Sequence, residues 1–129
     1  MSVVRVTTVI PTFNEGGRLG AFLEDWVSAA LSHPSPAVTA VIVDDGSSPQ
    51  EEARQRAAVN AGTARLQSAG APHRMVYLRV ERNQGKGASI RWGWSQAADA
   101  ASTWWSFVDG DGAVPATEYW RLALPPLSA

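Results

Sequence analysis

The fold is indicated most directly by the segment Val38-Thr-Ala-Val-Ile-Val-Asp-Asp-Gly-Ser-Ser-Pro49, which joins an apolar strand to a capped helix through a short acidic loop. Its first six residues are apolar or β-branched, which favours a buried strand that ends before Asp44. Ser48 followed by proline is typical of a helix start, and an Ala-, Arg- and Gln-rich helix is expected from there towards Ser68. The unit is therefore a strand, a polar loop and a helix.

The same unit recurs on both sides of this stretch. Upstream, we expect a strand from Val3 to Ile10 that stops at Pro11, and a helix whose apolar residues recur at steps of three and four. These residues are Leu19, Phe22, Leu23, Trp26, Val27, Ala30 and Leu31, before the break at Ser32-His-Pro-Ser-Pro36. Downstream, the expected elements are a strand over Met75–Val80, a helix from about Lys86 to Ala101, a strand over Trp104–Val108 and a short helix over about Ala116–Leu122.

Alternating strands and helices predict an α/β fold with a mostly parallel sheet and helices on both faces. The 129 residues, 45% of them hydrophobic, suffice for one domain over residues 1–129. A net charge of -1 gives no global field for nucleic acid, and the absence of cysteine excludes thiolate metal sites and a cysteine nucleophile. Without a signal peptide or an apolar run of membrane length, we expect a cytoplasmic protein.

Polar loops follow all four strands, and in such sheets ligands bind beyond the carboxyl ends of the strands. The segment Asp109-Gly-Asp-Gly112 has two carboxylates two residues apart, so that both can face one cation. Such oxygen ligands suit Mg²⁺ or Mn²⁺ bound to a substrate phosphate. An acidic, glycine-rich turn without a metal is the alternative interpretation, and the motif alone does not separate the two.

The other three loops carry further candidates for binding. Side chains of adjacent residues diverge, so we expect one of Asp44 and Asp45 to meet a ligand and the other to orient the loop or cap the next helix. In the loop after the first strand, Phe13 can pack beside a base and Glu15 can accept hydrogen bonds from one. The segment Asn83-Gln-Gly-Lys-Gly-Ala-Ser-Ile-Arg91 opens a helix with two cations, which favours phosphate binding, although solvated cations in a glycine-rich turn are an equally good interpretation.

Taken together, the four loops resemble family 2 glycosyltransferases, which have a GT-A fold. The segments that carry the resemblance are Ile10-Pro-Thr-Phe-Asn-Glu15, Val43-Asp-Asp-Gly-Ser47, Asn83-Gln-Gly-Lys-Gly-Ala88 and Asp109-Gly-Asp111. The last two, together with Arg91 and Gly93, are most similar to polyprenyl-phosphate glycosyltransferases such as the dolichyl-phosphate glucose and mannose synthases.

The resemblance implies a role for each matching residue. Nucleotide binding would fall to Pro11, Phe13, Glu15, Asp44 and Asp45, with Asp45 at the base; phosphate binding to Lys86 and Arg91; and Mn²⁺ or Mg²⁺ binding to Asp109 and Asp111. The donor would be a UDP- or GDP-sugar and the acceptor a lipid phosphate, with the protein peripheral at the inner face of a membrane. The resemblance also implies that the acceptor-binding half and the catalytic base lie outside this chain, so no catalytic residue is assigned.

Two other functions remain open at this stage. One is a non-catalytic, nucleotide-sugar-binding or oligomerising fragment, with exposed tryptophans among the six joining copies of the chain. The other is a haloacid-dehalogenase-like phosphatase, in which Asp109-Gly-Asp-Gly112 would supply nucleophile and acid. His33 and His73 lie in proline-flanked loops without further ligands at metal spacing, and we expect both at the surface.

Overall fold

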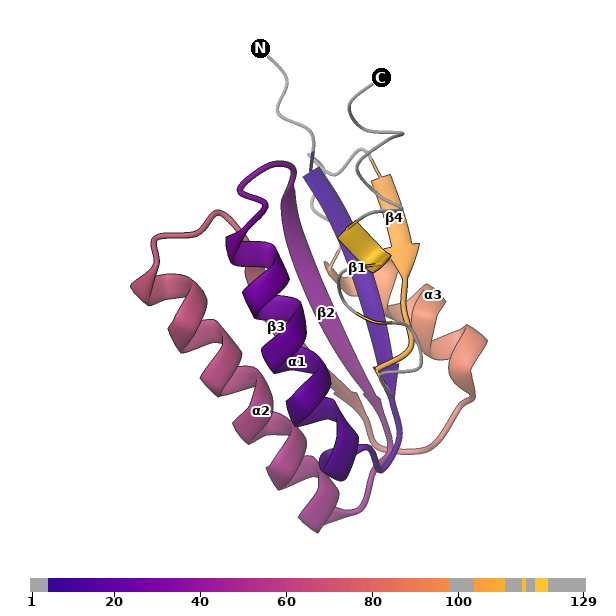
Figure 1. Ribbon diagram of the computed structural model, residues 1–129. Helices are drawn as coiled ribbons and strands as arrows, with labels where there is room; N and C mark the ends of the chain where they lie inside the picture. The colour runs from indigo at the N-terminus through magenta and orange to yellow at the C-terminus, as the bar shows by residue number, and fades with distance from the viewer. Residues whose placement is uncertain (1–4, 98–103, 111–114, 116–117, 121–129) are drawn as a thin grey trace.

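A four-stranded parallel sheet forms the centre of the molecule, with strand order β3-β2-β1-β4 (Figure 1). The computed structural model describes residues 5–97, 104–110, 115 and 118–120. The elements are β1 Arg5–Thr12, α1 Gly16–Leu31, β2 Ala37–Asp45, α2 Pro49–Ser68, β3 Arg74–Val80, α3 Lys86–Ala97 and β4 Trp104–Phe107. The predicted α/β class with a parallel sheet is confirmed.

The two faces of the sheet bury separate sets of side chains, because successive residues of a strand point to opposite faces. On β2, Val38, Ala40 and Ile42 pack with α1 and α2 in the larger core, whereas Val41 and Val43 pack with α3. Figure 1 accordingly shows α1 and α2 side by side on one face of the sheet and α3 on the other. With both faces covered, β2 is buried along almost its whole length.

Helix α3 approaches the sheet closely at Gly93. A Cβ atom at this position would lie 2.7 Å from Val43 Cγ2 and 3.0 Å from Val9 Cγ2. The absence of a side chain at Gly93 therefore lets the axis of α3 lie near β1 and β2. This close packing positions the N-terminus of α3 relative to the carboxyl ends of these strands.

Strands β1 and β2 each end two residues later than the sequence predicts. Pro11 does not stop β1, which runs to Thr12, and Asp44 and Asp45 are the last two residues of β2. Proline is tolerated near the end of β1 because only one ladder bond is lost there. The predicted start and end of α2 are confirmed, with Ser48 as its N-cap and the Ser48 hydroxyl accepting from the Glu51 N–H at 3.4 Å.

The surface location predicted for His73 is wrong. Its side chain is 3% exposed, and Nδ1 accepts a hydrogen bond from the Val38 N–H at 3.1 Å. Nε2 lies 2.7 Å from the carbonyl oxygen of His33 and 3.1 Å from that of Ala30. Burial lowers the pKa of His73 below its ordinary value of 6.5, although the two carbonyl groups oppose the shift. His33 is half-buried, with its ring stacked on Trp120.

The remaining elements predicted from sequence lie partly outside the described residues. These are the end of α3 after Ala97 and the short helix over about Ala116–Leu122, of which Glu118, Tyr119 and Trp120 are described as a helical turn. Among the described helices, none combines the length and the apolar character that crossing a membrane requires.

Candidate functional site

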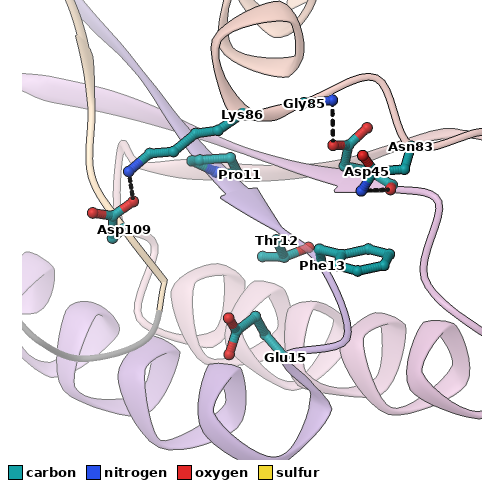
Figure 2. Close-up of a pocket in the computed structure, with 9 residues that line it drawn as sticks. All are labelled: Pro11, Thr12, Phe13, Glu15, Asp45, Asn83, Gly85, Lys86 and Asp109. Atoms are coloured by element: carbon teal, nitrogen blue, oxygen red, sulfur yellow. Dashed lines mark hydrogen bonds and ion pairs between the residues drawn. The ribbon is translucent and has the colours of Figure 1, made fainter.

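A pocket of about 290 Å³ lies at the carboxyl ends of the strands, where the strand order turns back at β1 (Figure 2). This volume is close to the lower end of the range for small-molecule sites. Residues from all four strand-end loops line the pocket, namely Pro11, Thr12, Phe13, Glu15, Asp45, Asn83, Gly85, Lys86 and Asp109. The polar segments that follow the four strands therefore meet in one pocket.

The end of β1 supplies one wall of the pocket. The Phe13 side chain is 47% exposed, so its ring offers an uncovered apolar face. Thr12 is buried, and its hydroxyl donates to the Val43 carbonyl oxygen at 3.4 Å, which ties the end of β1 to β2. The carboxylate of Glu15 forms an ion pair with Arg18 at 2.9 Å. This wall therefore combines a flat ring with an acceptor group.

Asp45 fixes the loop between β3 and α3. Its two carboxylate oxygens accept from the N–H groups of Gln84 at 2.8 Å and Gly85 at 3.0 Å. The Asn83 side chain donates to the Asp45 carbonyl oxygen at 3.2 Å. Asp45 is only 4% exposed, and each carboxylate oxygen keeps a second lone pair that a ligand can use. The carboxylate thus lines the pocket and also holds the opposite loop in place.

Asp44 does not line the pocket. It is fully buried on the other face of the sheet, as the alternation along a strand requires. Its carboxylate accepts from the Ser47 N–H at 2.8 Å and the Tyr77 hydroxyl at 2.5 Å, and it lies 3.5 Å from Arg79 Nε. Burial, and secondly the bond to Asp44, raise the pKa of the Tyr77 hydroxyl. Of the two roles expected for Asp44 and Asp45, Asp44 therefore has the one that orients the loop after β2.

The first residue of α3 faces the end of β4 across the pocket. Lys86 Nζ lies 2.5 Å from Asp109 Oδ1, and the two side chains are 53% and 44% exposed (Figure 2). The ammonium group also lies 5.9 Å from the centre of the Phe107 ring. A cation and a predicted metal ligand therefore share one end of the pocket, in contact with solvent.

Besides Asp44, two further predicted residues are not placed in the pocket. Arg91 lies five residues along α3 from Lys86, is exposed and does not line the pocket. Asp111 lies outside the described residues. Within the described part of the chain, no three His, Cys, Asp or Glu residues gather as a metal site would require. Asp109 nevertheless fits a divalent cation of the kind held by one or two carboxylates, waters and substrate phosphates, because its carboxylate is half-exposed inside the pocket.

Sequence reasoning missed Thr12, Asn83 and Gly85 as pocket residues and missed the buried Gln55 beneath them. Gly85 adopts a φ of +97°, which favours glycine, and Asn83 bonds to β2. Gln55 is fully buried at the head of the series Gln55, Val59, Gly62 and Leu66 on α2. This four-three-four spacing is the signal that could have identified Gln55 as facing the sheet.

Comparisons with known proteins agree with the observed fold. The sequence profile of Glycosyl transferase family 2 matches residues 7–126. The fold is similar to a crystal structure of S. aureus TarS 1-349, with a TM-score of 0.62, 20% identity and coverage of 93% of this chain and 31% of that one. It is also similar to S. aureus TarS 1-349 in complex with UDP-GlcNAc, with a TM-score of 0.56, 20% identity and coverage of 84% and 27%. No curated protein sequence gave a match. The chain thus spans under a third of these solved chains.

Proposed function

The chain belongs to glycosyl transferase family 2, and we propose that its pocket binds a nucleoside diphosphate sugar for transfer of the sugar to an acceptor. The observation that carries the proposal is the convergence of an exposed ring, a main-chain-bonded carboxylate, a helix N-terminus with a lysine and a second carboxylate in one pocket. The family match and the position of Asp109 after β4, the last strand of the described chain, favour this function over a dehalogenase-like phosphatase.

The pocket divides into a nucleoside end and a phosphate end. Phe13 would pack against the base, while Glu15 and Asp45 would accept hydrogen bonds from the base or the ribose. At the other end, the first N–H groups of α3 and the Lys86 ammonium group would meet the diphosphate. Support comes from the glycosyltransferase family and from the UDP-GlcNAc complex of the structurally similar S. aureus TarS.

We further propose that Asp109, together with Asp111, holds Mn²⁺ or Mg²⁺ against the diphosphate. When bound, the metal would neutralise charge on the departing nucleoside diphosphate. Lys86 would then leave Asp109 and contact a phosphate oxygen, so that one ammonium group serves the empty and the loaded pocket in turn. The residue that activates the acceptor is not assigned.

A polyprenyl phosphate is the acceptor that we propose, on the similarity of the Asn83–Ala88 and Asp109–Asp111 segments to enzymes that use one. Such an acceptor is already anionic at neutral pH, so it would not need a strong general base for attack. A lipid acceptor would place the protein at the cytoplasmic face of a membrane. The whole enzyme would then include acceptor-binding parts beyond the third of the similar solved chains that this sequence covers.

Calorimetric titration with UDP-GlcNAc, UDP-glucose and GDP-mannose, each with and without Mn²⁺, tests the donor site. We expect Mn²⁺-dependent binding of one donor, lost in Asp109→Asn and kept in Asp25→Asn, which changes an exposed carboxylate on α1. If a folded wild-type chain binds none of the three donors but releases phosphate from an aryl phosphate, the dehalogenase-like function replaces this one. Donor binding without sugar transfer to a polyprenyl phosphate would identify the chain as a binding module.

A further inference from the structure

Gln55 lies beneath the nucleoside end of the pocket without lining it. The residue belongs to the second turn of α2 and is fully buried. Its carbonyl oxygen accepts from the Glu15 N–H at 2.9 Å. Its amide nitrogen donates to the Ser47 hydroxyl at 3.3 Å and to the Tyr77 hydroxyl at 3.1 Å. One side chain therefore joins the loop after β1, the loop after β2 and strand β3.

A primary amide suits these three partners. The Glu15 N–H requires an acceptor, and the Tyr77 hydroxyl already donates to Asp44, so it must accept from Gln55. Ser47 Oγ likewise accepts from the Asn14 N–H at 2.8 Å and has room for a second donor. Glutamine offers one acceptor oxygen and two donors, and all three find a partner. A carboxylate in its place would lack both donors and would lie near the buried Asp44.

Helix α1 begins with few local means of holding its first turn. Glu15, its N-cap residue, makes no capping bond with its own side chain. The first N–H groups bond instead to α2, with Glu15 N to Gln55 and Gly16 N to Glu51 Oε2 at 2.6 Å. The direction in which α1 leaves β1, and hence the position of the Phe13–Glu15 loop, is set by α2.

On these grounds we propose that Gln55 is a positioning residue for the nucleoside end of the pocket. It holds the Phe13–Glu15 loop against the Ser47 loop, so that the Phe13 ring and the Glu15 carboxylate stay at a fixed distance from Asp45. Gln55 itself touches no ligand. The inference rests on the proposed function only in that the ligand at this end is a nucleoside.

Amide hydrogen exchange followed by NMR tests, without any ligand, whether Gln55 holds the Phe13–Glu15 loop. In the wild type the Glu15 N–H is expected to exchange slowly, since it is bonded to a buried acceptor. In Gln55→Met its exchange should accelerate by about tenfold or more relative to amides in β2. Val59→Ala, which removes core contacts one turn along α2, and Gln67→Met, which changes an exposed glutamine, should leave this ratio unchanged. A Glu15 amide that exchanges like an exposed one in the wild type overturns the proposal, whether or not the variant folds.

Donor titration then tests the consequence for the pocket. Gln55→Met should weaken donor binding by about tenfold, in keeping with losses seen when a supporting contact behind a ligand-binding residue is removed. Tyr77→Phe and Val59→Ala should lower the melting temperature while leaving the donor Kd within about twofold, because the Glu15 bond remains. Equal affinity in Gln55→Met and wild type overturns the positioning role. Absence of donor binding by a folded wild type overturns the proposed function instead. The exchange data then still show whether Gln55 holds the Phe13–Glu15 loop.

Discussion

Replacing Lys86 by methionine should change metal binding and donor binding in opposite directions. The Lys86 ammonium group lies 2.5 Å from Asp109 Oδ1, so a divalent cation that binds Asp109 competes with it. In the loaded pocket the same group would bond to a phosphate oxygen. Methionine has a similar length and helix propensity and carries no charge, so the substitution removes both interactions and little else.

The magnitudes follow from the exposure of the two side chains. Lys86 is 53% and Asp109 44% exposed, and an ion pair in such contact with water contributes about 0.2–1 kcal/mol. Lys86→Met should therefore tighten the binding of Mn²⁺ alone by at most about fivefold. A hydrogen bond from a charged donor contributes about 1.5–3 kcal/mol, so the binding of a nucleoside diphosphate with saturating Mn²⁺ should weaken by about 10- to 150-fold.

Calorimetry can measure both constants at one ionic strength, with Mn²⁺ alone in the first titration and UDP or GDP at saturating Mn²⁺ in the second. Arg91→Met is the matched control, since Arg91 is an exposed cation on the same helix outside the pocket, and we expect changes below about twofold there. The reasoning is refuted if Lys86→Met weakens the binding of Mn²⁺ alone, or if Arg91→Met reproduces the loss of nucleotide affinity.

Three further predictions concern stability. Gly46 has a φ of +82°, and a Cβ atom there would lie 2.8 Å from Asn83 N. Gly46→Ala should therefore lower the free energy of unfolding by about 1–3 kcal/mol in urea titrations. An unchanged urea midpoint would contradict this. Gly93→Ala should cost about 1–3 kcal/mol by overpacking two core valines, whereas Gly20→Ala, which meets no atom within 4 Å, should not destabilise. The pKa of His73 lies below 6.5 in the folded state, so as the pH falls the unfolded chain binds the His73 proton before the folded chain does. The free energy of unfolding should therefore decline as the pH falls below about 6.5. Melting temperatures of wild type and His73→Gln that fall in parallel with pH would refute this.

The sequence predicts the fold well because apolar residues recur with different spacings in its strands and in its helices. The apolar stripe of α1, the apolar run of β2 and the Ser48-Pro49 helix start each follow from one local rule, and each is confirmed. Strand ends are harder to predict, because pairing with a neighbour extends a strand through residues that disfavour it. Pro11 thus lies opposite Val43, and Asp44 opposite both Thr12 and Arg79.

The site is predicted only in part, for a different reason. A residue next to a strand end, such as Phe13 or Asp109, is placed in the pocket by topology alone, since parallel strands end at one edge. The burial of Gln55 and His73 depends on which helix packs across which loop, and glutamine and histidine are residue types that are common at exposed positions. Both are buried because they satisfy main-chain groups of other elements, a pairing that no local pattern reveals.

The two ends of the pocket differ in how firmly the sheet holds them, and this bears on the order of binding. β1 pairs with β2 over the eight residues from Arg5 to Thr12, and, within the part of the chain that the structure describes, with β4 over the four from Val6 to Val9. The nucleoside end, at β1 and β2, is further fixed by buried bonds from Gln55 and Asp45. The phosphate end depends on a solvent-exposed ion pair that a bound ligand can exchange at little cost. A nucleoside should therefore meet a formed surface, whereas a metal at Asp109 competes with Lys86 until, on the proposed function, a phosphate draws the ammonium group away. It follows that metal and nucleotide should bind cooperatively, each tightening the other by the same factor.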